Sequence, residues 1–223
     1  VLLTNGEMME VQSASELPDA QKIEAIEEPW VKAEVLTPKA YLGAVIELVL
    51  KIRGIQNNME FVDENLTIVH FRAPLATLLT DFYDQLKSVT SGYGSLNYDL
   101  DGYQQEDLVR VDFYVASEKV DALSLITHRA NAVNLGQDIV KRLKEIIPRQ
   151  MFKVSLQAGI GGKFIARADL SAMRKNVTGH LYGGDISRKK KLLQKQAKGK
   201  ERMKKFGKVE IPNDTFAVLL KKD

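Results

Sequence analysis

The sequence has no cysteine, a single tryptophan and only six prolines among its 223 residues. The absence of cysteine excludes disulfide bonds, thiolate catalysis and cysteine-ligated zinc. Long hydrophobic runs are missing as well. The longest mostly apolar stretch, residues 42–52, is interrupted by Glu47 and Lys51 and is far shorter than the roughly 20 residues that a membrane-spanning helix needs. We therefore expect a soluble protein.

The composition is otherwise typical of a globular protein. Hydrophobic residues make up 44% of the chain and charged residues 27%, which excludes a disordered or collagen-like chain. A length of 223 residues is more than one average domain, so we expect two compact units and an incomplete third.

The first residues predict a fragment of a sheet. The chain opens on Val1, without an initiator methionine or a signal-peptide pattern. Asn5-Gly6 lies between two apolar runs, which is typical of a two-residue hairpin turn. Because a two-stranded ribbon is marginal alone, we expect residues 1–27 to be the trailing edge of a domain that precedes Val1.

Residues 28–104 alternate strand and helix patterns in a recognisable order. Period-two alternation predicts a first strand, and an apolar stripe that begins at Thr37-Pro38 and ends at Arg53-Gly54 predicts a helix. The complete prediction is strands at 30–36, 55–63, 66–72 and 92–99 and helices at 39–51 and 74–86. Gly54 is expected to close the first helix in the left-handed conformation, and the second helix is expected to turn one apolar stripe inward, formed by Leu75, Leu78, Leu79, Phe82 and Leu86. This strand, helix, strand, strand, helix, strand order predicts a split βαβ, ferredoxin-like α+β domain.

Residues 105–223 predict a second α+β domain with a less regular pattern. The expected elements are strands at 108–115, 120–125, 152–156 and 163–167 and helices at 131–147 and 188–205. Glycine-rich residues 159–162 predict a tight turn between the last two strands.

No catalytic or metal-binding motif is present in the sequence. Gly162-Lys163 resembles the end of a phosphate-binding loop, but Gln157 stands where that loop needs glycine and Phe164 where it needs serine or threonine. His70, His128 and His180 have no partner at metal-ligand spacing. We therefore expect no catalytic residue, metal or cofactor within these residues.

Charge is strongly segregated along the chain. Residues 174–208 contain 13 of the 32 Lys and Arg residues but only two of the 29 Asp and Glu residues, a net charge of +11. The remaining residues therefore carry −8, although the whole chain is only +3. Such asymmetry points to a polyanionic partner such as nucleic acid or a membrane surface, while a merely solvated helix is the plainer interpretation.

The basic segment predicts an RNA-binding surface. In the helix that begins near Arg188, an inward stripe formed by Leu192, Leu193, Gln196 and Met203 would leave cations on the other faces to neutralise phosphates. Tyr182 could stack on a base beside the open backbone of two glycines, or it could simply anchor a core. The candidate RNA-binding residues are Arg174, Lys175, Tyr182, Gly183, Gly184, Arg188, Lys189, Lys191, Lys195, Lys198, Lys200, Arg202 and Lys204.

These residues resemble a known family. The run from Arg174 through Tyr182-Gly183-Gly184-Asp185 to Arg202-Met203-Lys204 is similar to the C-terminal domain of the LepA, or elongation factor 4, family of translational GTPases. The likeness extends upstream through Ile147-Pro148-Arg149-Gln150. Residues 28–54 resemble the domain that this family shares with elongation factor G.

The resemblance implies a role in translation. It implies a full-length protein whose GTPase domain, with GTP and magnesium, lies before Val1, and a fragment that neither binds nor hydrolyses GTP. Members of the family bind the ribosome and promote back-translocation of tRNAs, and a role in ribosome assembly is also proposed. The implied partners are the ribosome, ribosomal RNA and tRNA, and the implied state is a cytoplasmic monomer.

Two other hypotheses follow from the same charges. The basic helix could bind an anionic membrane surface, placing the protein peripherally on the cytoplasmic face of the cell membrane. Alternatively, it could pack against acids of the −8 remainder as a purely structural clamp.

Overall fold

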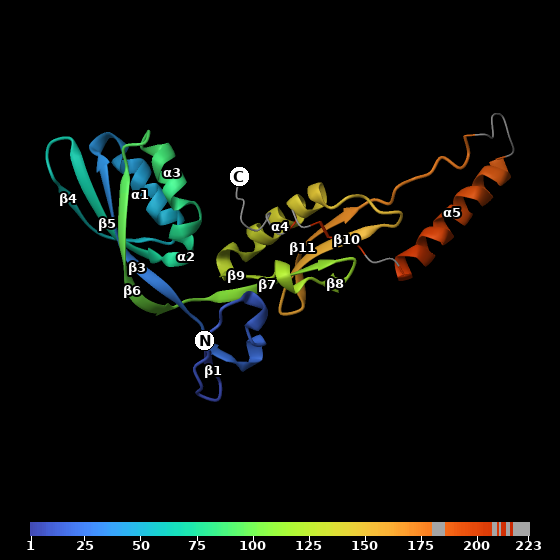
Figure 1. Ribbon diagram of the computed structural model, residues 1–223, viewed down its shortest axis with the longest axis horizontal. Coiled ribbons are helices and arrows are strands. Elements are labelled where there is room, and N and C mark those ends of the chain that lie inside the picture. The colour runs from blue at the N-terminus through green and yellow to red at the C-terminus, as the bar shows by residue number, and fades with distance from the viewer. Residues whose placement is uncertain (180–185, 207–208, 210, 213–214, 216–223) are drawn as a thin grey trace. The chain divides into compact units, whose positions relative to one another are not determined.

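A computed structural model describes residues 1–179, 186–206, 209, 211, 212 and 215 of the chain. The chain forms two compact units (Figure 1): Val1–Glu10 with Gln21–Asp107, and Val11–Ala20 with Leu108–Asp223. The segment 1–27 is thus divided between the two units, and its assignment to a preceding domain stays a prediction. No helix in the described part of the chain is long and apolar enough to cross a membrane.

The N-terminal segment forms a small sheet with a tight turn. Strand β1 (Leu2–Leu3) pairs with β2 (Ile23–Ala25), and the short helices η1 (Ala14–Glu16) and η2 (Ala20–Lys22) lie between them in sequence. The predicted Asn-Gly turn is present, because the Gly6 N–H donates to the Leu3 carbonyl at 2.9 Å. The apolar run after the turn does not form the expected second strand, however, because within it only Met8 makes a β-bridge, to Leu2.

The first unit has the predicted ferredoxin-like arrangement. Its four strands pair antiparallel in the order β4-β5-β3-β6. They are β3 (Glu27–Pro38), β4 (Ile55–Phe61), β5 (Leu66–Pro74) and β6 (Ser95–Gln105). One connection contains η3 (Lys39–Tyr41) and α1 (Leu42–Lys51), and the other contains α2 (Leu75–Thr77), η4 (Leu78–Phe82) and α3 (Tyr83–Val89). The predicted α+β class is therefore confirmed.

Alternation along β3 positions the core of this unit. Val31 and Val35 are completely buried and pack with Phe71 of β5 and Val45 of α1. The helices lie on one face of the sheet (Figure 1), so that each strand contributes every second side chain to the core.

The end of α1 differs from the prediction. The residue with left-handed backbone is Arg53, with φ of 64°, and not Gly54. Glycine is needed at position 54 because the backbone there passes close to Val49: a Cβ would lie 2.6 Å from the Val49 carbonyl oxygen.

The second predicted helix is interrupted by a π turn, η4. Leu78, Phe82 and Leu86, spaced four residues apart, are buried, whereas Leu79 is 60% exposed. The prediction that Leu79 belongs to the inward stripe is therefore wrong, because the stripe follows the i, i+4 row alone.

The second unit is built around a central strand. This strand, β7 (Leu108–Val115), pairs with β10 (Val154–Ile160) on one side and with β8 (Glu118–Lys119) and β9 (Leu125–His128) on the other. Strand β11 (Lys163–Leu170) completes the sheet. The helices are η5 (Asp121–Leu123), α4 (Arg129–Ile146) and α5 (Ile186–Phe206). The predicted strand at 120–125 is wrong, since η5 occupies residues 121–123 and, of the six residues, only Leu125 lies in a strand, β9.

Helix α4 supplies much of the core of the second unit. Ile139 and Leu143 of α4 pack with Phe113 of β7 and Leu156 of β10. The helix begins after His128, whose Nδ1 accepts a hydrogen bond from the Ala130 N–H at 3.2 Å. The glycine-rich bend is a tight turn between β10 and β11, as predicted, and both Gly161 and Gly162 have positive φ there.

Truncation of Leu86 tests the core of the first unit. Leu86→Ala should lower the free energy of unfolding by about 2–5 kcal/mol, because it leaves a cavity where the side chain is fully buried. The fluorescence of Trp30, the single tryptophan, follows unfolding of this unit in urea. Leu79→Ala removes the same atoms from an exposed position and should change stability by less than about 0.5 kcal/mol. Equal losses would contradict the core described here.

Candidate nucleic-acid interface

Helix α5 packs one side against the extended segment 171–179 that follows β11 (Figure 1). Leu192, Gln196 and Gly199 are half-buried, and with Met203 they share one side because they are spaced four, three and four residues apart. The predicted inward stripe is thus correct for Leu192 and Gln196. It is wrong for Leu193, which is 41% exposed, and Met203 is 49% exposed although it lies on the packed side and lines the pocket described below.

Two side chains of α5 bond to backbone carbonyls of this segment. Gln196 Nε2 donates to the Lys175 carbonyl oxygen at 2.9 Å. Lys200 Nζ donates to the Met173 carbonyl oxygen at 2.5 Å, and the Met173 N–H donates to the Gln150 carbonyl oxygen. These bonds fix the side that α5 turns toward the protein.

Five basic residues form a continuous line on α5. Their spacings of three and four residues place them on one side of the helix, over a length of about 21 Å. All five are exposed, and Glu201, the one acid in α5, lies outside the line. We call this line the basic row; it consists of Arg188, Lys191, Lys195, Lys198 and Arg202.

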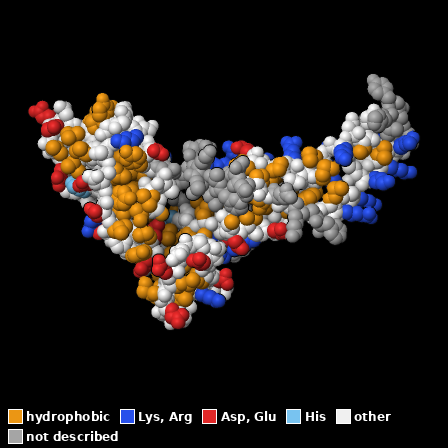
Figure 2. Space-filling view, viewed as in Figure 1, with side chains coloured by type: hydrophobic (Ala, Val, Ile, Leu, Met, Phe, Trp, Pro, Cys, Tyr) orange, Lys and Arg blue, Asp and Glu red, His pale blue; other side chains and the backbone are white. Residues whose placement is uncertain are grey.

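The basic row is not neutralised by the part of the protein that the structure describes. Within residues 1–179 and 186–206, none of its side chains forms an ion pair with a carboxylate. Figure 2 shows Lys and Arg side chains gathered along α5. The hypothesis of a structural clamp therefore finds no support among these residues.

Two cations near β11 are paired with a carboxylate. Lys153 Nζ lies 2.9 Å from a carboxylate oxygen of Asp169, and Arg167 Nη2 lies 3.3 Å from the other. The Lys153 ammonium, and then the Arg167 guanidinium, hold the pKa of Asp169 below its usual value although partial burial acts against them. Lys153 and Arg167 thus have a carboxylate partner, whereas the basic row has no such partner among the described residues.

The other candidate residues have different positions. Arg174 and Lys175 are exposed on the segment 171–179, and Lys204 is exposed on α5 outside the row. Lys189 and Lys200 are half-buried at the edge of the packed side. Tyr182, Gly183 and Gly184 lie outside the described residues.

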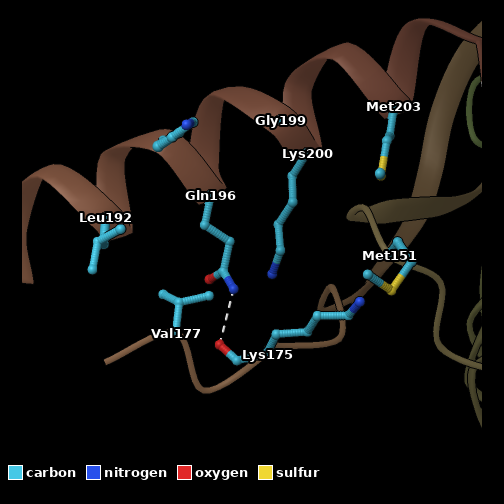
Figure 3. Close-up of a pocket in the computed structure, with 9 residues that line it drawn as sticks. Met151, Lys175, Val177, Leu192, Gln196, Gly199, Lys200 and Met203 are labelled. Atoms are coloured by element: carbon cyan, nitrogen blue, oxygen red, sulfur yellow. Dashed lines mark hydrogen bonds between the residues drawn. The ribbon is translucent and has the colours of Figure 1, made fainter. Parts of the chain in front are cut away.

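A pocket of about 320 Å³ lies between α5 and the segment 171–179 (Figure 3). The sequence patterns did not predict this pocket. The one feature that could have indicated it is Gly199, a glycine inside a helix that consists mostly of good helix formers. The pocket is lined by Met151, Lys175, Val177, Leu192, Lys195, Gln196, Gly199, Lys200 and Met203. Among the described residues, no cluster of three His, Asp or Glu side chains could hold a metal ion.

Comparison with known proteins gives two family matches. Residues 115–221 match the model of the GTP-binding protein LepA C-terminus, and residues 25–112 match that of the elongation factor G C-terminus. The two matches follow one another along the chain and together define the C-terminal part of a translation factor.

Similar proteins agree with these matches. The chain is 51% identical over 223 residues to elongation factor 4 of Halalkalibacterium halodurans and 50% identical over 220 residues to that of Streptococcus thermophilus. It spans 37% and 36% of those two proteins. The chain belongs to the LepA family, also called elongation factor 4, and corresponds to a C-terminal part of it.

The ion pairs at Asp169 predict a titration that can be measured. The pKa of Asp169 should lie below its usual value of 3.8, and Lys153→Gln should raise it because the ammonium that lies nearest to the carboxylate is lost. Since its pKa is lowered in the folded state, ionised Asp169 stabilises the fold at neutral pH, and this contribution disappears as the pH falls through that lowered pKa. Carboxyl-carbon NMR follows the midpoint. Lys141→Gln, on the exposed surface of α4, serves as the control, and an equal shift in both variants would refute the assignment.

Proposed function

We propose that this chain is the ribosome- and tRNA-binding C-terminal part of a LepA-type translation factor, and that α5 lies against RNA phosphates. The observation that supports this most directly is the basic row, which is exposed and has no ion-pair partner among the described residues. Family membership supplies the context, because the relatives are translation factors.

The chemistry of such a row suits the RNA backbone. Lysine and arginine neutralise phosphates and release counterions, which gives affinity without selecting a base sequence. Arg174, Lys175 and Lys204 would add contacts at either side, and Tyr182 remains the candidate for base stacking.

The proposal extends to the full-length protein. We propose that it binds GTP and magnesium outside the matched region, hydrolyses GTP on the ribosome in the cytoplasm, and promotes back-translocation of tRNAs as a monomer. On this view residues 28–104 form the domain shared with elongation factor G, and residues 105–223 form the family-specific domain that contacts RNA.

The dependence of tRNA affinity on salt tests this proposal. The logarithm of the association constant should fall with the logarithm of salt concentration at a slope of about −0.7 to −0.9 per phosphate contact, or about −4 to −5 for six contacts. Lys195→Gln with Lys198→Gln removes two cations of the basic row and should make the slope less steep by about 1.4 to 1.8. Filter binding over a salt series gives the slope.

A matched control separates local contacts from overall charge. Lys141→Gln with Lys163→Gln removes the same net charge from exposed positions of the second unit outside α5 and should reduce the slope by less than half as much. A flat salt response, or equal changes in both double variants, would refute the basic row as the contact surface. Sedimentation with vesicles provides a further test, since binding to anionic vesicles but not to tRNA would favour the membrane hypothesis.

A further inference from the structure

The pocket between α5 and the segment 171–179 combines apolar walls with a few polar groups. Val177 and Leu192 face each other at one end, and Met151 and Met203 lie at the other (Figure 3). Gln196 and Lys200 extend from α5 into the space between these ends. At about 320 Å³, it is at the small end of the range for ligand sites, roughly 300–1,000 Å³.

The polar groups of the pocket retain hydrogen-bonding capacity. The Lys200 ammonium has three donors, and the structure shows one of them directed at the Met173 carbonyl. Gln196 donates through Nε2 to the Lys175 carbonyl, which leaves its Oε1 as an acceptor. A ligand with apolar faces and a polar edge would therefore match the walls and the two side chains together.

The charges around the pocket favour a nucleotide over an apolar peptide. Lys175, Lys195 and Lys200 line it, and no acid does among the residues that the structure describes. Lys195 also belongs to the basic row, so the row meets the pocket at this residue. A phosphate chain that follows the row would thus place its bases beside this opening.

Gly199 keeps the pocket open. A Cβ at this position would meet no other atom within 4 Å, so the space in front of the helix is empty there. A Cβ alone is accommodated there, but a side chain as long as leucine at position 199 would project into the pocket from the centre of the packed side of α5.

We propose that this pocket binds one unpaired nucleobase of the RNA whose phosphates lie along the basic row. The base lies between the apolar side chains at the two ends, its polar edge faces Lys200 and Gln196, and its flanking phosphates lie near Lys175 and Lys195. This inference rests on the proposed function and adds to it a preference for RNA with an unstacked base.

Filling the pocket tests the inference without changing any charge. Gly199→Leu in the 223-residue chain should weaken binding of a single-stranded RNA about tenfold, a loss within the range expected for one stacked base. Binding of a fully paired duplex of the same sequence, and the salt slope for both RNAs, should stay unchanged. Leucine is a better helix former than glycine, so α5 itself should remain intact.

Two variants serve as controls. Gly199→Ala adds a Cβ that the site accommodates and should bind both RNAs as the unaltered chain does. Ala197→Leu adds bulk at an exposed position of the same helix and should also leave both affinities unchanged. A 2-aminopurine placed in the single strand gives a second readout: its emission should rise on binding to the unaltered chain and to Gly199→Ala, but not to Gly199→Leu.

The outcomes distinguish this inference from the proposed function. If the unaltered chain binds neither RNA, the proposed function fails and the inference fails with it. If the chain binds both RNAs with a steep salt slope but Gly199→Leu leaves the single-strand affinity unchanged, only the pocket inference is overturned. A variant that loses both RNAs equally would also overturn it, because the pocket would then support the helix without receiving a base.

Discussion

The bonds from Gln196 and Lys200 to the carbonyl oxygens of Lys175 and Met173 determine what α5 presents to its surroundings. A helix with so many lysines has no broad apolar stripe that would fix its rotation by burial alone. Charge-assisted and amide hydrogen bonds to a backbone segment supply that constraint. These bonds turn the side of α5 that contains Leu192 toward the protein and leave the basic row exposed.

The two units contribute in different ways. In the first, a four-stranded antiparallel sheet carries helices on one face, a stable scaffold whose core alternates along β3 and β5. In the second, a sheet around β7 packs against α4, and the segment after β11 extends to α5. Paired cations such as Lys153 occur near β11, whereas the basic row has no carboxylate partner among the described residues. This contrast explains why net charge alone, only +3 for the whole chain, conceals the cationic surface.

Sequence patterns predicted most elements because their causes are local. The alternation of residues 30–36 and the turn at Gly161-Gly162 follow from side-chain period and backbone freedom. The predictions were wrong where tertiary packing decides which side chains of a helix are buried. Leu79 is exposed within the π turn, where the buried side chains follow the row Leu78, Phe82 and Leu86. Leu193 is exposed because the hydrogen bonds of Gln196 and Lys200 turn a different side of α5 toward the segment 171–179. The pocket could not be predicted, since Met151 and Met203 lie 52 positions apart in the sequence and share no pattern.

The sequence by itself determined the ferredoxin-like order of the first unit, the concentration of positive charge in one helix and the resemblance to the LepA family. Each of these depends on residue type and on spacing over a few positions, which a linear chain displays directly. Only the tertiary structure decided which cations form one exposed row and which side chains enclose a pocket. The physical reason is that the rotation of α5 is fixed by hydrogen bonds to residues more than 20 positions away, and such contacts exist only once the chain has folded.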